Sequence, residues 1–172
     1  MLSSRAGAQN GGVTALAELL ADTVEQLEGL PDESLGVWKQ SRGIGRLRAA
    51  PTLQPAGRAW RLGVLLIDRH GNLFETGEVT RAIEPQVAVT SRTLLAEERR
   101  EIRRAAARGK FPEGEVVNHS YTPIDVDELA RAGTSGPLIL ENGIVRVRWK
   151  AGDGTRPLDA YLHERIGLLR EG

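Results

Sequence analysis

The pattern of apolar and polar positions is most distinctive over residues 58–83, where it predicts a β-hairpin at the centre of the fold. Residues 60–67 are apolar on almost every side, and such a strand belongs in the middle of a sheet. The return strand, residues 73–80, is more polar and is expected nearer an edge. Between them, Asp68 can bond the backbone ahead of it, and Gly71 can adopt the positive φ that closes the turn.

A second hairpin is predicted over residues 137–150, because Asn142-Gly143 separates two apolar runs. Its return strand alternates, with Val145, Val147 and Trp149 on the inner face. A further strand is expected over residues 115–121. Each hairpin presents one apolar face, and the chain has the length of a single core. We therefore expect the two hairpins to share one sheet, with Trp60 and Trp149 on its buried side.

Helical periodicity predicts about four helices. Apolar stripes with steps of three and four mark residues 13–28 and 157–170 (Val13, Leu16, Leu20, Val24 and Leu27; Leu158, Leu162, Ile166 and Leu169). A third helix over residues 93–108 has Leu95, Ile102 and Ala106 as its predicted buried face and ends at Gly109. A short helix over residues 126–132 is expected to be capped by Asp125, with Glu128 in the first turn, and to end at Gly133.

These elements predict the α+β class, because strict alternation of strands and helices is missing. The sequence predicts a flexible N-terminal tail over residues 1–12 and a single domain over residues 13–172. We expect an antiparallel sheet of about five strands built from hairpins and packed by the helices. Residues 32–57 leave two alternatives open, either a short helical turn carrying Leu35 and Trp38 within a solvated connector, or a lid folded over the core.

Composition narrows the classes of function. The chain has 172 residues, 23 lysines and arginines against 23 aspartates and glutamates, and no cysteine. Balanced charge argues against nucleic acid as a partner, and the missing cysteines exclude a disulfide scaffold and a cysteine nucleophile. Without an apolar run of spanning length, a soluble, cytoplasmic protein without a membrane partner is expected. No pattern indicates a metal site or a cofactor.

Candidate chemistry is sparse. The polar stretch of residues 118–128 offers His119, Tyr121 and Asp125 as weak catalytic candidates, although Asp125 already has a capping role. Two basic groups could bind an anion, one in the segment after residue 38 and one on the third helix (Arg42, Arg46 and Arg48; Arg100 and Arg104). The competing interpretation is a solvated loop and a solvated helix face held by pairs such as Glu101–Arg104. Neither the G-x-S-x-G nor the S-x-x-K pattern of serine hydrolases occurs.

Three stretches, GRAWRLGVLLIDRHGNLFETGEVTRA, EERREIRRAAARGKFPEGEVVNHSYTPIDVDELARAGTSGPL and RVRWK with RPLDAYL, resemble a family of uncharacterised bacterial proteins. Some members of that family are labelled glutaminase, which implies amide hydrolysis. Two hypotheses of function follow. The first is a non-catalytic α+β binding or assembly domain, and the second is a small glutaminase-like amide hydrolase with a dispersed site.

Self-association is also expected from the pattern. The strand at residues 62–67 needs cover on both faces, whereas the helix over residues 93–108 has a narrow apolar side. A second copy could complete that cover, most simply as a two-fold homodimer. The sequence does not indicate which small-molecule ligand, if any, the protein binds.

Overall fold

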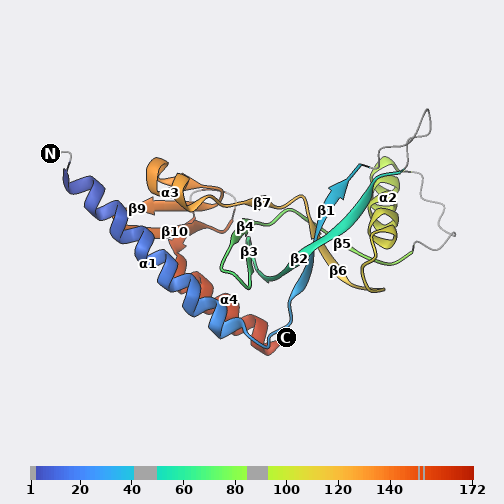
Figure 1. Ribbon diagram of the computed structural model, residues 1–172, viewed down its shortest axis with the longest axis horizontal. Coiled ribbons are helices and arrows are strands. Elements are labelled where there is room, and N and C mark those ends of the chain that lie inside the picture. The colour runs from blue at the N-terminus through green and yellow to red at the C-terminus, as the bar shows by residue number, and fades with distance from the viewer. Residues whose placement is uncertain (1–2, 41–49, 85–92, 151, 153) are drawn as a thin grey trace. The chain divides into compact units, whose positions relative to one another are not determined.

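The computed structural model has the predicted α+β class (Figure 1). It describes residues 3–40, 50–84, 93–150, 152 and 154–172. Where the sequence predicts one domain, the chain divides into two compact units. Unit 1 comprises Met1–Asp32, Trp60–Thr76 and Thr122–Gly172, and unit 2 comprises Glu33–Ala59 and Gly77–Tyr121. Each unit has a hydrophobic core of its own.

The described chain contains four helices and eleven strands. The helices are α1 (Ser3–Leu27), α2 (Leu94–Arg108), α3 (Val126–Ala132) and α4 (Leu158–Glu171). The strands are β1 (Glu33–Lys39), β2 (Thr52–Leu62), β3 (Leu65–Asp68), β4 (Leu73–Glu75), β5 (Glu78–Arg81), β6 (Val116–His119), β7 (Thr122–Pro123), β8 (Thr134–Ser135), β9 (Leu138–Glu141), β10 (Ile144–Arg148) and β11 (Thr155–Pro157). They form two sheets, in the orders β5-β6-β1-β2-β3-β4-β7 and β11-β10-β9-β8.

The predicted sheet of about five antiparallel strands is therefore wrong in size and pairing. One sheet has seven strands and the other four, and β1 pairs with β6 in parallel. Parallel pairing joins residues far apart along the chain, so neither hairpin periodicity nor turn chemistry indicates it.

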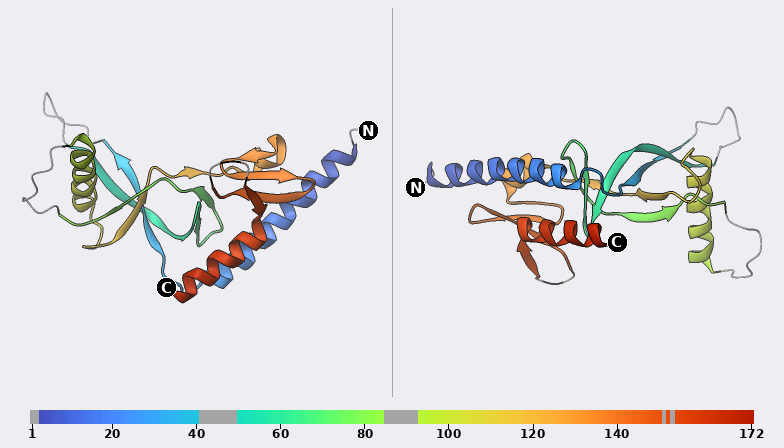
Figure 2. Two further views of the ribbon diagram at one scale, coloured as in Figure 1. Left: turned by 180° about the vertical axis from the view of Figure 1, so that it is seen from behind. Right: turned by 90° about the horizontal axis from the view of Figure 1, so that it is seen from below.

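Unit 1 is built on the two long apolar stripes that the sequence predicts. The α1 and α4 stripes enter one core with the inner positions of β2, β3 and β9 (Leu16, Leu20, Leu27, Leu62, Leu65, Ile67, Leu138, Leu158, Leu162 and Ile166). The two helices also join directly, because Arg170 donates from Nη2 to the Gln26 carbonyl at 3.2 Å. Figure 2 shows both helices from two further sides.

Helix α1 begins at Ser3, so most of the predicted tail over residues 1–12 is helical. Gly12, within this stretch, is buried. A Cβ at Gly12 would lie 3.1 Å from the Gly143 carbonyl oxygen and 3.1 Å from Leu140 Cδ1. Glycine therefore lets α1 approach the β9–β10 turn closely, a tertiary role that composition alone does not reveal.

The central hairpin forms between β3 and β4, and its turn is as predicted. Asp68 Oδ1 accepts hydrogen bonds from the backbone N–H groups of His70 and Asn72, and Gly71 has a φ of 78°. The flanking strands are shorter than predicted. The apolar run of residues 60–67 is divided at Gly63, whose φ is 66°. The return strand is divided at Gly77, where a Cβ would collide with the backbone carbonyl oxygens of His119 and Ser120.

The division at Gly63 is held by Tyr161 of α4, which is completely buried. Its hydroxyl donates to the Leu62 carbonyl and accepts from the Val64 N–H, both at 2.9 Å. A Cβ at Gly63 would collide with this hydroxyl. One side chain of α4 thus satisfies the backbone groups on both sides of the break.

Tyr161→Phe is expected to lower the free energy of unfolding by about 2 kcal/mol, because two backbone groups lose their buried partner. Urea unfolding of both proteins measures the difference. The ring is retained, so the dependence of stability on urea should not change. An unchanged midpoint would show that water replaces the hydroxyl without cost.

The second hairpin, β9–β10, has the predicted Asn142-Gly143 turn, with φ values of 51° and 79°. These two positive values match the turn geometry that favours Asn-Gly. The hairpin belongs to the four-stranded sheet, so the prediction that both hairpins share one sheet is wrong. Its edges are already paired with β8 and β11. The hairpins nevertheless share the unit 1 core, through Leu62 and Val147 among others.

Unit 2 contains a strand that the sequence analysis missed. Residues 33–39 form β1, which pairs with β2 on one side and β6 on the other, so the predicted helical turn and the lid are both wrong there. Gly36 permits the strand, because a Cβ at this position would lie 2.7 Å from Val117 Cγ1. The small core beneath α2 consists of Leu53, Ala82, Ala106, Phe111 and Val117, with Ile102 packed against it.

Helix α2 has the predicted extent, and Ile102 and Ala106 of its predicted buried face pack on the unit 2 core, but Leu95 does not. Ala105 and Ala106 are buried near its C-terminal end, whereas Leu95 is 68% exposed. The backbone of α2 approaches β2 so closely at Gly109 that a Cβ there would collide with the Leu53 carbonyl oxygen. The alanine-rich half of the helix therefore packs on the sheet, and the half that begins with Leu94 and Leu95 leaves apolar side chains open to solvent.

Candidate functional site: a groove in unit 2

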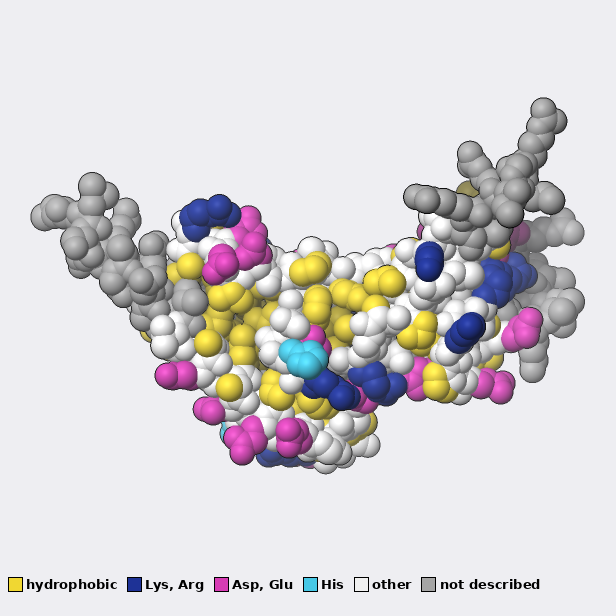
Figure 3. Space-filling view, in the orientation of Figure 1, with side chains coloured by type: hydrophobic (Ala, Val, Ile, Leu, Met, Phe, Trp, Pro, Cys, Tyr) yellow, Lys and Arg dark blue, Asp and Glu magenta, His cyan; other side chains and the backbone are white. Residues whose placement is uncertain are grey.

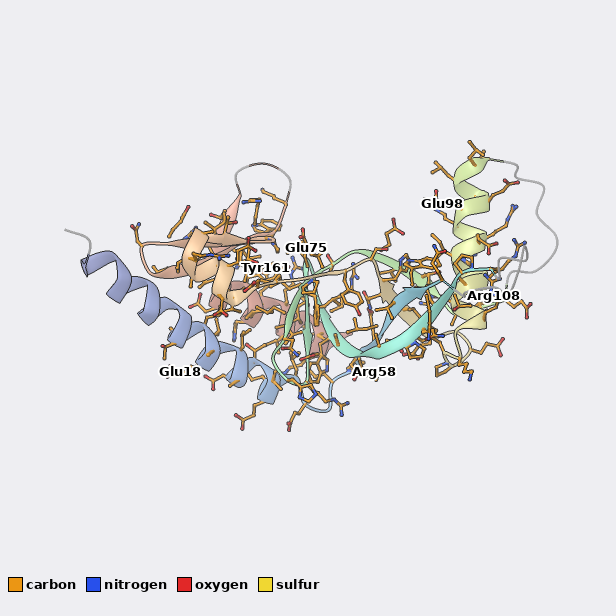
Figure 4. All side chains as sticks on the ribbon, turned by 45° about the horizontal axis from the view of Figure 1, so that its top comes forward. Glu18, Arg58, Glu75, Glu98, Arg108 and Tyr161 are labelled. Carbon is orange, nitrogen blue, oxygen red and sulfur yellow. The ribbon has the colours of Figure 1, made fainter. Side chains whose placement is uncertain are left out.

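A groove of about 590 Å³ lies between residues 95–103 of α2 and strands β5 and β6. Its lining comes from these three elements (Glu78, Val79, Thr80, Leu95, Glu98, Arg99, Ile102, Arg103 and His119). Figure 4 labels Glu98, a lining residue, and Arg108, near the opposite end of the helix. The groove thus occupies the part of α2 that does not pack tightly on the sheet.

Apolar side chains form one part of the groove. Leu95 is 68% and Val79 45% exposed, and both belong to the lining together with Ile102. Trp38 is 41% exposed, and its ring meets the His119 ring edge-on at 5.8 Å between centroids. Exposed apolar side chains that gather around a hollow are typical of a binding surface.

Two arginines form another part of the groove. Arg99 and Arg103 are four residues apart and so lie on one side of α2. Within the described ranges, no ion pair joins either guanidinium to a carboxylate. By contrast, Arg104 and Arg108 contact Glu101 at 3.3 and 3.0 Å, and these contacts, led by that of Arg108, lower the pKa of Glu101. Figure 3 shows one face of the molecule, on which dark blue Lys and Arg side chains are interspersed with magenta Asp and Glu side chains.

His119 lies at the inner end of this lining, with a side chain only 1% exposed. Its Nδ1 is 3.1 Å from Ser120 Oγ. Its Nε2 has no hydrogen-bond partner among the described residues and lies 3.8 Å from Glu78 Oε2. Burial lowers the pKa of the imidazole, because desolvation disfavours the charged form, and the Glu78 carboxylate opposes this shift in part.

The depressed pKa of His119 predicts that unit 2 loses stability in acid. The unfolded chain takes up a proton near pH 6.5, whereas the folded imidazole takes it up only at lower pH. The contribution of neutral His119 to the stability of unit 2 is complete above pH 6.5. It is lost as the pH falls from 6.5 through the pKa of His119 in the folded protein. Urea unfolding at pH 5 and pH 8 should show this slope in the wild type and a smaller slope in His119→Gln.

His70→Gln is the matched control, because His70 lies on the exposed β3–β4 turn. It should keep the wild-type slope. The charged side chains that line the groove with His119 include Glu78, Arg99 and Arg103. Glu78→Gln is a useful further variant, because it removes the carboxylate that opposes the lowering of the His119 pKa. Equal slopes in the wild type and His119→Gln would contradict the assignment.

The structure distributes the catalytic candidates from the sequence between the two units. His119 and Tyr121 belong to unit 2, and Asp125 belongs to unit 1. Tyr121 is not part of the groove lining, and burial raises its pKa. Asp125 has the predicted capping role, because its Oδ1 accepts from the Glu128 N–H at 3.0 Å.

Of the predicted anion-binding residues, Arg42, Arg46 and Arg48 lie outside the described residues. Arg100 and Arg104 border a separate shallow hollow on α2 with Glu97, Glu98 and Glu101. The groove instead takes Arg99 and Arg103. A helical projection places these two beside the Leu95–Ile102–Ala106 stripe, which is the signal that could have selected them.

Comparison of the chain with protein-family models, curated proteins and solved structures gives no match. Within the part of the chain that the structure describes, no three or more His, Asp or Glu side chains gather where they could hold a metal ion. None of the described helices is long and apolar enough to cross a membrane.

Proposed function

We propose that the protein is a non-catalytic binding protein and that the unit 2 groove holds its ligand. One observation carries this proposal. The groove combines the exposed apolar side chains of Val79 and Leu95 with two guanidinium groups, those of Arg99 and Arg103, which form no ion pair among the described residues although Glu78 and Glu98 also line the groove. A ligand with an apolar part and an anionic part would complement both features.

The energetics favour such a ligand. Covering exposed apolar surface contributes about 25 cal/mol for each Å² removed from water. Arg99 and Arg103 present planar donor groups that bind carboxylates or phosphates at two points. A guanidinium already paired within the chain, such as that of Arg104, would first have to give up its partner.

A direct test uses NMR shifts of backbone amides in ¹⁵N-labelled protein. The probes are a panel of short-chain carboxylates and N-acetylated tripeptides. Shifts should concentrate on Val79, Leu95, Arg99 and Arg103. Arg103→Glu should weaken binding at least about tenfold, whereas Arg104→Glu, the same change at the adjacent position outside the groove, should weaken it far less. Equal loss in both variants, or shifts only outside unit 2, would overturn the proposal.

Amide hydrolysis is a second candidate, favoured by one observation. Ser120 Oγ lies 3.1 Å from His119 Nδ1, and Glu78 lies 3.8 Å beyond the other ring nitrogen. A hydroxyl, an imidazole and a carboxylate in series are the components of a serine hydrolase. Ser120 is not a lining residue of the groove, so a ligand held there is not placed against its hydroxyl.

We expect the purified protein to release no ammonia from glutamine. Wild type, Ser120→Ala and His119→Gln should all match the blank in a coupled ammonia assay. Release by the wild type that Ser120→Ala abolishes would establish the hydrolase instead. Release retained in both variants would point to a contaminant.

Self-association stays a prediction, and the structure removes one of its two motives. Leu62, Leu65 and Ile67 of the central strand are buried in the unit 1 core of a single chain. They therefore need no second copy for cover. Light scattering decides the matter, because a mass near 18.7 kDa would reject the dimer and twice that mass would support it.

A further inference from the structure

We propose that the groove binds a small zwitterion, an amino acid with an apolar side chain, whose ammonium group lies between His119 Nε2 and the Glu78 carboxylate. This inference rests on the proposed binding function and names the class of ligand. The His119 side chain is 1% exposed, and its Nε2 has no hydrogen-bond partner among the described residues. A buried polar atom without a partner costs free energy, so a ligand atom that supplies the missing bond is favoured.

The geometry around His119 indicates what that ligand atom must be. Glu78 of β5 is directly opposite His119 of β6, and Nε2 lies 3.8 Å from Glu78 Oε2, too far for a hydrogen bond. The other ring nitrogen, Nδ1, is 3.1 Å from Ser120 Oγ. A neutral imidazole has one N–H, so a proton on Nδ1 that bonds to Ser120 leaves a lone pair on Nε2. Nε2 and the carboxylate are then two facing acceptors without a donor between them.

A primary ammonium group fits this pair of acceptors. It has N–H groups enough to donate to Nε2 and to Glu78 Oε2 at once, and its bond to the carboxylate is charge-assisted. The Glu78 side chain is 67% exposed, so it can turn outward to admit the ligand. A metal ion would need further ligands, and no third His, Asp or Glu of the described chain gathers with these two residues.

The other parts of the ligand have their partners on α2. A helical projection places Glu98 on one flank of the stripe formed by Leu95 and Ile102, and Arg99 and Arg103 on the other flank. The stripe can receive an apolar side chain. The two guanidinium groups, which are exposed and form no ion pair within the described ranges, can bind a carboxylate at two points.

The balance of charge in the groove favours a ligand that has no net charge. Glu78 and Glu98 offset Arg99 and Arg103, and burial lowers the pKa of His119, so the imidazole is neutral at pH 7. A ligand with charge of one sign would leave the groove charges of that sign without a partner. A hollow of about 590 Å³ is also in the size range of sites for small molecules.

Three ligands of matched size separate the contributions of the two ligand charges. L-Norleucine carries both charges, hexanoate lacks the ammonium group, and pentylamine lacks the carboxylate. Titrations at pH 8, followed by the backbone amide shifts of ¹⁵N-labelled protein, measure the three dissociation constants. Norleucine should bind at least about tenfold more tightly than either of the others, because only norleucine makes both charge-assisted contacts. Equal affinity for norleucine and one of the others would overturn the inference.

Glu78→Gln tests the ammonium position, because it removes the negative charge from an exposed side chain and keeps its size. Norleucine should lose its advantage over hexanoate, whereas hexanoate should bind at least as tightly as it binds to wild type. Glu97→Gln is the matched control, since Glu97 lies on α2 but outside the groove lining. It should leave norleucine binding unchanged. An advantage of norleucine that persists in Glu78→Gln would contradict the site.

The ring nitrogens of His119 provide a readout that does not depend on affinity. In protein labelled with ¹⁵N in its histidines, we expect a proton on Nδ1 and an unprotonated Nε2. The Nε2 resonance should shift on addition of norleucine but not of hexanoate, while the exposed His70 and His163 serve as internal controls. A proton on Nε2 in the free protein would overturn the inference, because that nitrogen would then be a donor to Glu78.

The same measurements separate this inference from the proposed function. If hexanoate shifts the groove amides, Arg103→Glu removes that effect and norleucine gains nothing over hexanoate, the zwitterion inference fails and the binding function stands. If neither these three ligands nor the panel of carboxylates and tripeptides shifts the groove amides, both fail.

Discussion

Trp60→Ala is expected to lower the free energy of unfolding by about 3–5 kcal/mol, the largest effect that we predict in unit 1. The side chain is 7% exposed and belongs to the unit 1 core. Its Nε1–H also donates to the Leu30 carbonyl at 3.1 Å, next to the end of α1. Alanine would leave a large cavity and remove the bond partner of a backbone carbonyl.

Urea or guanidinium unfolding followed by circular dichroism measures this effect. Trp149→Ala is the comparison, and here the structure corrects the expectation that Trp149, like Trp60, lies on the buried side of the sheet. Trp149 is half-buried against the core, with Lys150 Nζ 4.9 Å from its ring centroid. Its loss should cost only about 1–2 kcal/mol, since it buries less area. Equal costs for the two variants would contradict the burial assigned to Trp60.

Gly109→Ala is expected to destabilise unit 2 by about 3 kcal/mol, at the upper end of what overpacking usually costs. The added Cβ would collide with the Leu53 carbonyl oxygen, and its next contact would be the Leu53 carbonyl carbon at 2.8 Å. A backbone carbonyl within a paired strand cannot rotate away as a side chain can. The end of α2 would have to move off β2, and the small core beneath it would open.

Hydrogen exchange resolved by peptide locates this effect. Faster exchange should appear in β2 and α2, with little change in α1 and α4. Gly167→Ala in α4 is the matched control, because a Cβ there would meet no atom within 4 Å. It should stabilise the protein by up to about 1 kcal/mol through helix propensity. Normal exchange in Gly109→Ala would show that the helix and strand separate without cost.

Much of the candidate site was accessible from the sequence, but its assembly was not. The sequence singled out His119 and a helix rich in arginine. It did not predict the contact between Glu78 and His119, because that contact depends on the register of β5 against β6. It also favoured Arg100 and Arg104, whereas the groove is lined by Arg99 and Arg103. One residue of difference on a helix rotates a side chain by about 100°, so the choice required the actual packing of α2.

Features that depend on neighbouring residues could be predicted from the amino-acid pattern alone. These are the stripes of α1 and α4, the capped helix between Asp125 and Gly133, and the turns at Asp68 and Asn142-Gly143. In each, the residues that set the conformation lie within about one or two turns of one another. Helix periodicity, side-chain caps and positive φ values are local properties, so no distant contact was needed to predict them.

Strand pairing and the position of the groove depend instead on contacts between segments that are distant along the chain. Two predicted strands are divided at glycines. At Gly63 the Tyr161 hydroxyl occupies the space that a Cβ would need, and at Gly77 the backbone of His119 and Ser120 does so. The continuation of the first hairpin thus pairs in unit 2 with β6, and β1 joins β6 in parallel. Which strands pair depends on the free energies of contacts between residues that are distant along the chain. A local pattern of apolar positions is compatible with several such pairings.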